Sequence, residues 1–402
     1  MDWRAKTLTY QTLALTQKIK IHTNRYYYLF QKYLLLSFLL LCNYSASASQ
    51  IINKVPVHAL YVPLADHYAG IVAYERYRST FKHADFSLEQ MPNWDLLRAK
   101  FLTDDIDMAF VMSPLAMDMF MQKPEFRWIG LMHRDGNALA VNRVLLKHMN
   151  LPEQRINRKP NSELAQALKI TAHKNKEQTL IGMPHLLSTH TVVLYQYLKA
   201  HGLTMSLMPN TNTDVLAITV APSKSPVFLK SQANRALTAA FEQSLPWADI
   251  VETQGYGKVA WYSKDVMNWP GGHVECITIA SDNAIAEKSL AIKEIMTAIH
   301  IAGQDIESAR MSGGAALDEI VTIIQKHMPA HTEAAIKASL DINLQVINYK
   351  NLNIDIDGLR LIMDTAVEGK ILKKPININD FANHQFSFSA PIEYNSTQIG
   401  DH

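Results

Sequence analysis

The sequence is poor in cysteine, glycine and proline, and its charges nearly balance. Only 2 cysteines among 402 residues exclude a disulfide framework and a metal cluster built from several cysteines. With 15 glycines and 16 prolines, collagen-like and proline-rich chains are also excluded. Lysine and arginine number 39 against 37 acidic residues, so no broad basic field is available to bind nucleic acid. The 48% hydrophobic and 19% charged fractions are typical of a globular protein, long enough for two lobes.

Residues 1–48 are predicted to form a secretory signal peptide, which places the protein in the periplasm. A basic stretch ends at Lys32, an uncharged run extends from Tyr33 to Cys42, and small residues lead up to Ala48. The run has about half of the roughly 20 residues that a membrane-spanning helix needs, which favours a cleaved signal over an uncleaved anchor. A lipid anchor on Cys42 stays open, although Leu41 stands where such sites have a small residue. The long basic region also leaves open a start downstream of the first methionine.

Without this segment the chain is slightly acidic, because the segment contains 6 basic residues and 1 acidic residue. It then keeps one cysteine, Cys276, which suits an oxidising compartment because it has no partner with which to mispair.

Apolar runs typical of strands alternate with amphipathic stretches typical of helices. Strands are expected at 57–62, 108–112, 128–132, 179–183 and 274–280, and residues 284–369 are expected to be mostly helical. Residues 237–241 form a further apolar segment, whose pattern fits a strand or a helix. Alternation of this kind predicts an α/β fold with mainly parallel sheets flanked by helices and a helical C-terminal part. No long glycine-, serine- or proline-rich linker divides the chain, so two lobes would be joined by strands.

Polar residues directly follow four of the expected strands. In an open parallel sheet, ligands bind beyond the carboxyl ends of the strands, so these residues are candidates to line a site. They are Asp66, His67, Ser113, Pro114, His133, His185, Ser188 and Thr189. The serines and Thr189 open helices, and helix N-termini favour a small anion, although simple helix capping explains the serines equally well. Nearby acids, including Asp135 and Glu275, favour a protonated amine instead, so the charge of the ligand stays open.

The common catalytic motifs are missing, which favours a protein that is not an enzyme. There is no G-x-S-x-G elbow, no phosphate-binding G-x-x-x-x-G-K-[ST] loop and no G-x-G-x-x-G. Although the chain has 16 histidines, none pairs in the H-E-x-x-H sense, so we expect no metal and no cofactor. Cys276 lies in an expected buried strand, where a free thiol is usually inert.

Four stretches of this sequence resemble one known family. They are Leu60-Tyr-Val-Pro-Leu-Ala-Asp66-His67, Asp107-Met-Ala-Phe-Val-Met-Ser113-Pro114, Ala240-Phe-Glu242-Gln-Ser-Leu-Pro246-Trp247 and Pro270-Gly-Gly-His273-Val-Glu-Cys276. Their order is similar to that in periplasmic substrate-binding proteins of ABC transporters. The resemblance is to the nitrate, sulfonate, taurine and bicarbonate branch, which has relatives similar to thiamine-pyrimidine binders.

The resemblance implies the two-lobed, type II periplasmic-binding-protein fold. One lobe would comprise residues 49–138 with 271–402, and the other residues 139–270, closing on a small ligand like a hinge. The implied function is capture of a small polar molecule for delivery to a membrane permease and its ATPase, by a monomer. The resemblance also adds Glu242 and Trp247 to the predicted lining, and Trp94 and His273 join them as candidates. Two alternatives stay open: a periplasmic ligand sensor, and a pyrimidine-synthase-like enzyme whose cysteine-rich motif this chain lacks.

Overall fold

The computed structural model describes residue 32 and residues 53–103, 105–175, 178–209 and 212–389. Lys54–His402 form one compact unit. The predicted signal peptide therefore lies outside the described residues, apart from Lys32. Within the described part of the chain, no helix combines the length and the apolar character that crossing a membrane requires.

The first sheet has five strands in the order β2-β1-β3-β12-β4. Its strands are β1 (Val55–Tyr61), β2 (Ala84–Gln90), β3 (Met108–Met112), β4 (Phe126–Leu131) and β12 (Cys276–Ser281). Strand β1 pairs in parallel with both β2 and β3. Strand β12 comes from much later in the chain and inserts antiparallel between β3 and β4. Because β12 is antiparallel, its first residues lie at the edge where β3 ends.

The second sheet has six strands in the order β11-β6-β10-β7-β9-β8. Its strands are β6 (Asn137–Asn142), β7 (Thr179–Met183), β8 (Met205–Ser206), β9 (Val215–Thr219), β10 (Ala239–Ser244) and β11 (Gly257–Tyr262). Strands β10, β7, β9 and β8 run parallel, and β6 is antiparallel to both β10 and β11. A short antiparallel pair, β5 (Arg134–Asp135) with β13 (Ile347–Asn348), forms where the chain passes from β4 to β6.

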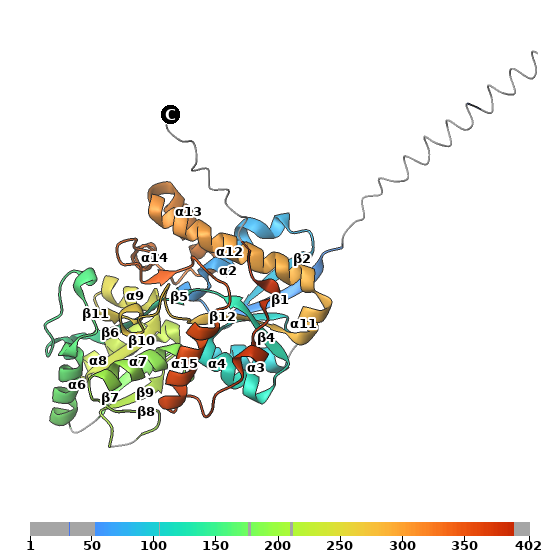
Figure 1. Ribbon diagram of the computed structural model, residues 1–402. Helices are drawn as coiled ribbons and strands as arrows, with labels where there is room; N and C mark the ends of the chain where they lie inside the picture. The colour runs from blue at the N-terminus through green and yellow to red at the C-terminus, as the bar shows by residue number, and fades with distance from the viewer. Residues whose placement is uncertain (1–31, 33–52, 104, 176–177, 210–211, 390–402) are drawn as a thin grey trace, which may run out of the picture. The chain divides into compact units, whose positions relative to one another are not determined.

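Helices flank both sheets (Figure 1). They are α2 (Tyr68–Tyr77), α3 (Trp94–Thr103), α4 (Ser113–Gln122), α5 (Arg143–Leu146), α6 (Ser162–Asn175), α7 (Thr189–Ala200), α8 (Ser225–Asn234), α9 (Trp247–Thr253), α10 (Ser263–Val266), α11 (Asp282–Glu287), α12 (Ser289–Ser312), α13 (Gly314–His327), α14 (Glu333–Ser339), α15 (Ile356–Glu368) and α16 (Ile378–Phe381). The long helix α12 packs on α2 and β2 of the first sheet. Helix α15 contacts α4 beside the first sheet and α7 beside the second, so the C-terminal helical part connects the two.

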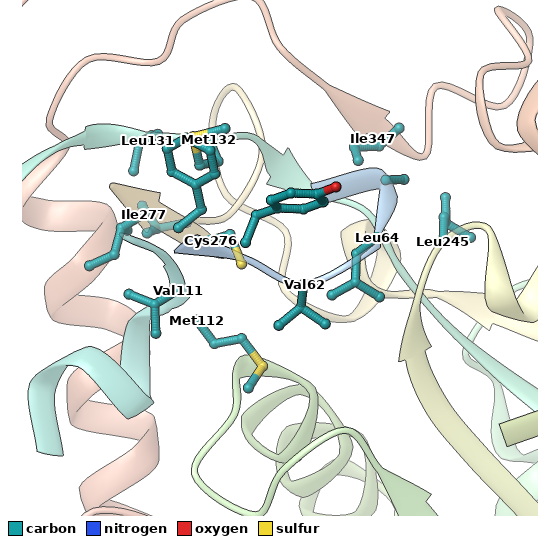
Figure 2. Packing of buried hydrophobic residues seen from close by; sticks show 14 of the residues in the cluster. Val62, Leu64, Val111, Met112, Leu131, Met132, Leu245, Cys276, Ile277 and Ile347 are labelled. Atoms are coloured by element: carbon teal, nitrogen blue, oxygen red, sulfur yellow. The ribbon is translucent and has the colours of Figure 1, made fainter. Parts of the chain in front are cut away.

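One hydrophobic core extends between the sheets. Val111 of β3 and Ile277 of β12 are fully buried, as expected for central strands covered on both faces. Figure 2 shows them near Cys276, while Leu245, which follows β10, and Ile347 of β13 approach the same core from the other side. The core thus brings the beginning of β12 and the end of β10 close together.

The α/β fold predicted from the sequence is confirmed, and both large sheets are mixed rather than purely parallel. In α3, Trp94, Leu97 and Phe101 are buried on one face as their spacing predicts. The apolar segment expected at 237–241 is the strand β10, shifted to Ala239–Ser244. The division into residues 49–138 with 271–402 and residues 139–270 stays a prediction.

Candidate functional site

Asp66 is the point at which the ends of several strands meet. It lies in a 3-10 turn after β1, and its side chain is fully buried. The Oδ2 atom accepts a hydrogen bond of 2.8 Å from the hydroxyl of Ser244 at the end of β10, and Cys276 Sγ donates to it over 3.5 Å. The Oδ1 atom lies 3.6 Å from His133 Nε2. One carboxylate thus contacts residues from both large sheets and from the segment between them.

Glu275 is the second carboxylate of this group and directly precedes β12. Its Oε2 atom lies 3.0 Å from His133 Nε2, and its Oε1 atom lies 3.4 Å from His190 Nδ1 in α7. His190 also pairs with Ser244, with 2.9 Å between Nε2 and Oγ. These contacts define a polar centre, composed of Asp66, His133, His190, Ser244, Glu275 and Cys276, all of them fully buried.

Opposite charges inside the polar centre stabilise one another. Burial by itself would lower the pKa of His133, but Asp66 and Glu275 outweigh it and raise that pKa to about 10. Burial acts against the ionised form of Asp66, yet His133 holds the pKa of that carboxyl at about 2. His133 is therefore charged at neutral pH and lies between the carboxyl groups of Asp66 and Glu275.

Glu242 adds a third carboxyl without a partner. Its side chain is fully buried in β10, and neither carboxyl oxygen has a hydrogen-bond partner within the described residues. Burial, reinforced by repulsion from Glu275 and Asp66, raises the pKa of Glu242 well above its ordinary value. No lysine or arginine in the described part of the chain forms an ion pair with these three acids. The region as a whole is acidic.

His67 and Trp94 form an aromatic wall next to Asp66. Their ring centroids are 5.9 Å apart in an edge-to-face arrangement, and Phe110 of β3 lies 5.6 Å from His67. Burial lowers the pKa of His67 to about 4, so the ring is neutral at neutral pH. Its Nδ1 atom lies 2.6 Å from the Val62 carbonyl oxygen, which leaves Nε2 as an acceptor. In the described residues neither His67 Nε2 nor Trp94 Nε1 has a hydrogen-bond partner.

The first turns of α4 and α7 also meet. Ser113 Oγ and Thr189 Oγ1 are 3.4 Å apart. Ser188 caps α7, because its Oγ accepts from the backbone N–H of Thr191 at 3.1 Å. Ser113, by contrast, is the first residue of α4 rather than its cap, and Pro114 follows it inside the first turn. Its hydroxyl is thus directed to Thr189 instead of its own helix.

The remaining predicted residues lie outside the polar centre. Trp247 donates from Nε1 to the Pro63 carbonyl at 3.3 Å, and its ring packs edge-on against His331. His273 lies beside Asp135, with 3.5 Å between Nε2 and Oδ1. His185 pairs with Asp95 at 3.2 Å near the surface.

Three members of the polar centre were not among the residues predicted to bind a ligand: His190, Ser244 and Cys276. Glu275 was recognised only as an acid near the expected site. Glu275 and Cys276 could have been predicted as site residues only from the antiparallel orientation of β12, because an antiparallel strand begins at the edge where its neighbour β3 ends. That direction is set by long-range pairing and is not visible in the local sequence.

A separate open hollow of about 560 Å³ lies beside β5 and β13. Its lining is charged, but the main cations already have partners. Arg134 pairs with Asp355 at 2.7 Å, and Arg310 donates to the Ile347 carbonyl at 2.7 Å. Among the described residues, Asp66, His133 and Glu242 have buried side-chain atoms without a hydrogen-bond partner, and none of the three lines this hollow.

Several solved structures share this fold. The ligand-binding component of an ABC-type import system from Staphylococcus aureus, with zinc bound, matches with a TM-score of 0.63 and 17% identity over 83% of this chain and 98% of that one. The periplasmic nitrate-binding protein NrtA from Synechocystis matches with a TM-score of 0.63 and 15% identity over 82% and 84%. The alkanesulfonate-binding protein SsuA from Xanthomonas axonopodis, bound to MOPS, matches with a TM-score of 0.60 and 11% identity over 82% and 98%.

These matches confirm the periplasmic-binding-protein fold that the sequence predicted. The same fold also occurs in an enzyme, since the desulfurization enzyme DSZB matches with a TM-score of 0.51 and 12% identity over 83% of this chain and 97% of that one. No curated protein sequence matches. The sequence model of the NMT1-like family matches residues 52–324, which is more than half of the chain. The chain therefore belongs to the NMT1-like family.

Proposed function

We propose that this protein is the extracytoplasmic solute-binding component of an ABC importer, which holds a small solute at the polar centre. The observation that carries the proposal is the contact of Asp66 with Ser244 and His133, because it joins strand ends of both sheets in one buried group. Strand ends are where ligands bind in this class of fold. The structural neighbours include binding components of import systems, which supports the same role here.

The composition of the polar centre favours a cation or a solute rich in hydrogen-bond donors. Asp66, Glu242 and Glu275 bring three carboxyls, and within the described residues the imidazolium of His133 is the cation that lies against them, because burial lowers the pKa of His67 and His190. A buried oxyanion such as nitrate or a sulfonate would stand unpaired beside these acids, which is costly. We therefore place this protein's solute apart from the anions bound by its neighbours NrtA and SsuA.

Delivery of the solute requires export of the protein and two partners. We propose that residues 1–48 direct secretion to the periplasm and that the protein hands its solute to a permease driven by an ATPase. Two lobes, residues 49–138 with 271–402 and residues 139–270, would separate to admit the solute and close over it as a monomer. Separation is needed because every residue of the polar centre is fully buried.

A thermal-shift screen of the protein purified from the periplasmic fraction tests this proposal. The panel contains divalent metal chlorides, protonated amines, aminopyrimidines, nitrate, bicarbonate and alkanesulfonates. A solute at 100 times its Kd stabilises the native state by about 2.7 kcal/mol, which is readily detected. We expect a shift with a cation or donor-rich solute, a smaller shift in Ser244→Ala, and no shift with the anions. No shift with any member of the panel, or a shift with the anions alone, would contradict the proposal.

An enzymatic role is the second candidate, because the fold is shared with DSZB and Cys276 lies in the polar centre. A cysteine nucleophile needs a base beside it. In the part of the chain that the structure describes, Cys276 Sγ is hydrogen-bonded to the carboxylate of Asp66 and to no histidine nitrogen. Mass spectrometry of the solute after incubation and denaturation separates the two functions, since a binding protein returns the solute unchanged.

A sensor that binds the same solute is distinguished by its genomic neighbours. Genes for a permease and an ATPase beside this one support import. A neighbouring kinase or cyclase gene in their place favours sensing.

A further inference from the structure

The polar centre contains more acid than its own bases balance. Asp66 and Glu275 share the imidazole of His133, Glu275 has one further contact of 3.4 Å with His190, and the fully buried carboxyl of Glu242 has no partner among the described residues. The Oδ1 atom of Asp66 likewise has no hydrogen-bond partner there. Burial of unpaired carboxyl groups is unfavourable, so these groups indicate a bound cation.

Four atoms of the polar centre are spaced like the ligands of one metal ion. Ligand atoms of Asp66, His133, Glu275 and Cys276 all lie within 4.8 Å of one another. The closest pairs are 3.0 Å for His133 Nε2 and Glu275 Oε2, and 3.5 Å for Cys276 Sγ and Asp66 Oδ2. Bonds of about 2.0–2.3 Å to one zinc ion place tetrahedral ligands about 3.3–3.8 Å apart, so small side-chain shifts suffice to form such a site.

We propose that the solute held by the polar centre is a divalent transition-metal ion of the zinc class, with Asp66, His133, Glu275 and Cys276 as its ligands. This inference rests on the proposed solute-binding function and deepens it by naming the class of solute. It departs from the expectation, drawn from histidine spacing in the sequence, that the chain holds no metal.

The donor set selects the class of metal. Calcium and magnesium prefer oxygen ligands throughout, whereas an imidazole nitrogen and a thiolate sulfur beside two carboxylates suit zinc, cobalt(II) and related ions. On binding, the ion replaces one proton on Cys276 and one on His133, and both protons pass to the solvent.

Neighbouring side chains hold the two carboxylates in position. Ser244 donates to Asp66 Oδ2 at 2.8 Å, and Asn137 Nδ2 lies 3.5 Å from Glu275 Oε1. Hydrogen bonds of this kind orient metal-binding carboxylates and their loss typically lowers metal affinity about 10–100-fold. The polar centre therefore has both a ligand set and the outer partners that such sites need.

Cobalt(II) provides a direct spectroscopic test. The protein purified from the periplasm is stripped with EDTA, freed of chelator and titrated with cobalt chloride alone. We expect one equivalent to produce the visible bands of tetrahedral cobalt together with a near-ultraviolet thiolate-to-cobalt band. Zinc is expected to displace cobalt and to raise Tm, while calcium and magnesium are expected to change neither.

Three variants assign the ligands. Cys276→Ser is expected to lose the thiolate band, and His133→Gln to lower zinc affinity at least about 100-fold, beyond the range for outer partners. His331→Gln is the matched control, because His331 is a fully buried histidine outside the polar centre, and it is expected to bind cobalt normally. Circular dichroism and Tm without metal show whether each variant is folded.

The outcomes separate the metal from the binding function. Absence of cobalt binding, or a thiolate band that persists in folded Cys276→Ser, overturns the metal site. If organic cations nevertheless shift Tm, the proposed solute-binding function stands without the metal. If neither metals nor the organic panel bind, both proposals fail. A thiolate band lost only in Cys276→Ser, with zinc affinity lowered in His133→Gln, supports the site as stated.

Discussion

The hydroxyl oxygens of Ser113 and Thr189 lie 3.4 Å apart, although 76 residues separate them in the chain. Ser113 begins α4 at the end of β3, and Thr189 begins α7 after β7. Both side chains are fully buried. The N-termini of two helices, one beside each sheet, thus meet close to the polar centre. The interaction energy of this pair therefore measures one contact that holds the two sheets together.

A double-mutant cycle on this pair is expected to show coupling. Ser113→Ala and Thr189→Val are each expected to lower the free energy of unfolding by about 0.5–1 kcal/mol, since the contact is long and both groups are neutral. The double variant is expected to cost clearly less than the sum of the two, because each single change already removes the shared bond. Urea denaturation measures all four proteins.

Ser281→Ala serves as the control for this cycle. Ser281 caps α11 at the far end of β12, with its Oγ 3.3 Å from the Ala284 nitrogen, and does not contact Ser113. Its effect is expected to add to that of Ser113→Ala. Strict additivity of Ser113→Ala and Thr189→Val would show that the two hydroxyls do not interact in solution.

Glu242→Gln is expected to stabilise the metal-free protein at neutral pH. The pKa of Glu242 is raised in the folded state relative to its ordinary value of 4.5, because of burial and the nearby acids. Its favourable contribution is therefore complete below pH 4.5 and is lost as the pH rises, by about 1.4 kcal/mol per pH unit until the folded pKa is reached. Replacing the carboxyl with an amide removes that loss.

The comparison is made by urea denaturation in EDTA between pH 4.5 and 8. The wild-type protein is expected to lose stability relative to Glu242→Gln as the pH rises, while the variant binds cations more weakly. Equal slopes for the two proteins would show that Glu242 titrates normally.

Much of the fold follows from local sequence patterns, whereas the polar centre does not. The all-apolar segment that forms β3 and the serine that caps α7 were both predicted, because burial and capping leave marks at fixed spacing. The edge strand β2 was missed, since four of its seven residues are polar. Asp66 and Cys276 lie 210 residues apart, and only the antiparallel insertion of β12 brings them together.

The same limit explains the residues of the site that were misjudged. Cys276 looked inert because it lies in an expected buried strand, and Ser244 lies beyond the apolar segment 237–241, whose type was left open. Ser113 was expected to cap its helix, but it is one residue inside it, which frees its hydroxyl for Thr189. Local propensity predicts where a side chain lies along its element, and tertiary pairing decides what it faces.

His331 is expected to make the protein sensitive to acid. Burial lowers the pKa of His331 to about 3, and its ring lies between the Tyr68 hydroxyl at 3.1 Å and the Pro63 carbonyl at 3.2 Å. Because the folded pKa is below the ordinary value of 6.5, the contribution is complete above pH 6.5 and is lost as the pH falls toward 3. The expected slope is about 1.4 kcal/mol per pH unit.

Denaturation followed by tryptophan fluorescence suits this measurement, since Trp247 packs against His331. His331→Gln keeps hydrogen-bonding capacity but cannot take up the proton. It is therefore expected to be less stable than wild type at pH 7 and to lose less stability between pH 6.5 and 5. A variant whose stability falls as steeply as that of wild type would assign the acid sensitivity to other groups.

Removal of the buried guanidinium of Arg158 is expected to lower the free energy of unfolding strongly. It is 1% exposed, and its guanidinium donates to both carboxylate oxygens of Glu252, at 2.7 and 3.0 Å, and to the Val259 carbonyl at 2.9 Å. Arg158→Met leaves Glu252 without its bidentate partner and the buried carbonyl of β11 without a donor, which is expected to cost about 3–5 kcal/mol. Arg158→Lys is expected to recover only part of this, because an ammonium group cannot reproduce the planar fork.

Lys258→Met, which removes an exposed pair with Glu153 in the same region, is the control and is expected to leave the free energy of unfolding unchanged. If Arg158→Met were tolerated as well as Lys258→Met, the guanidinium would be filling space beside β11 rather than holding the strand to α9.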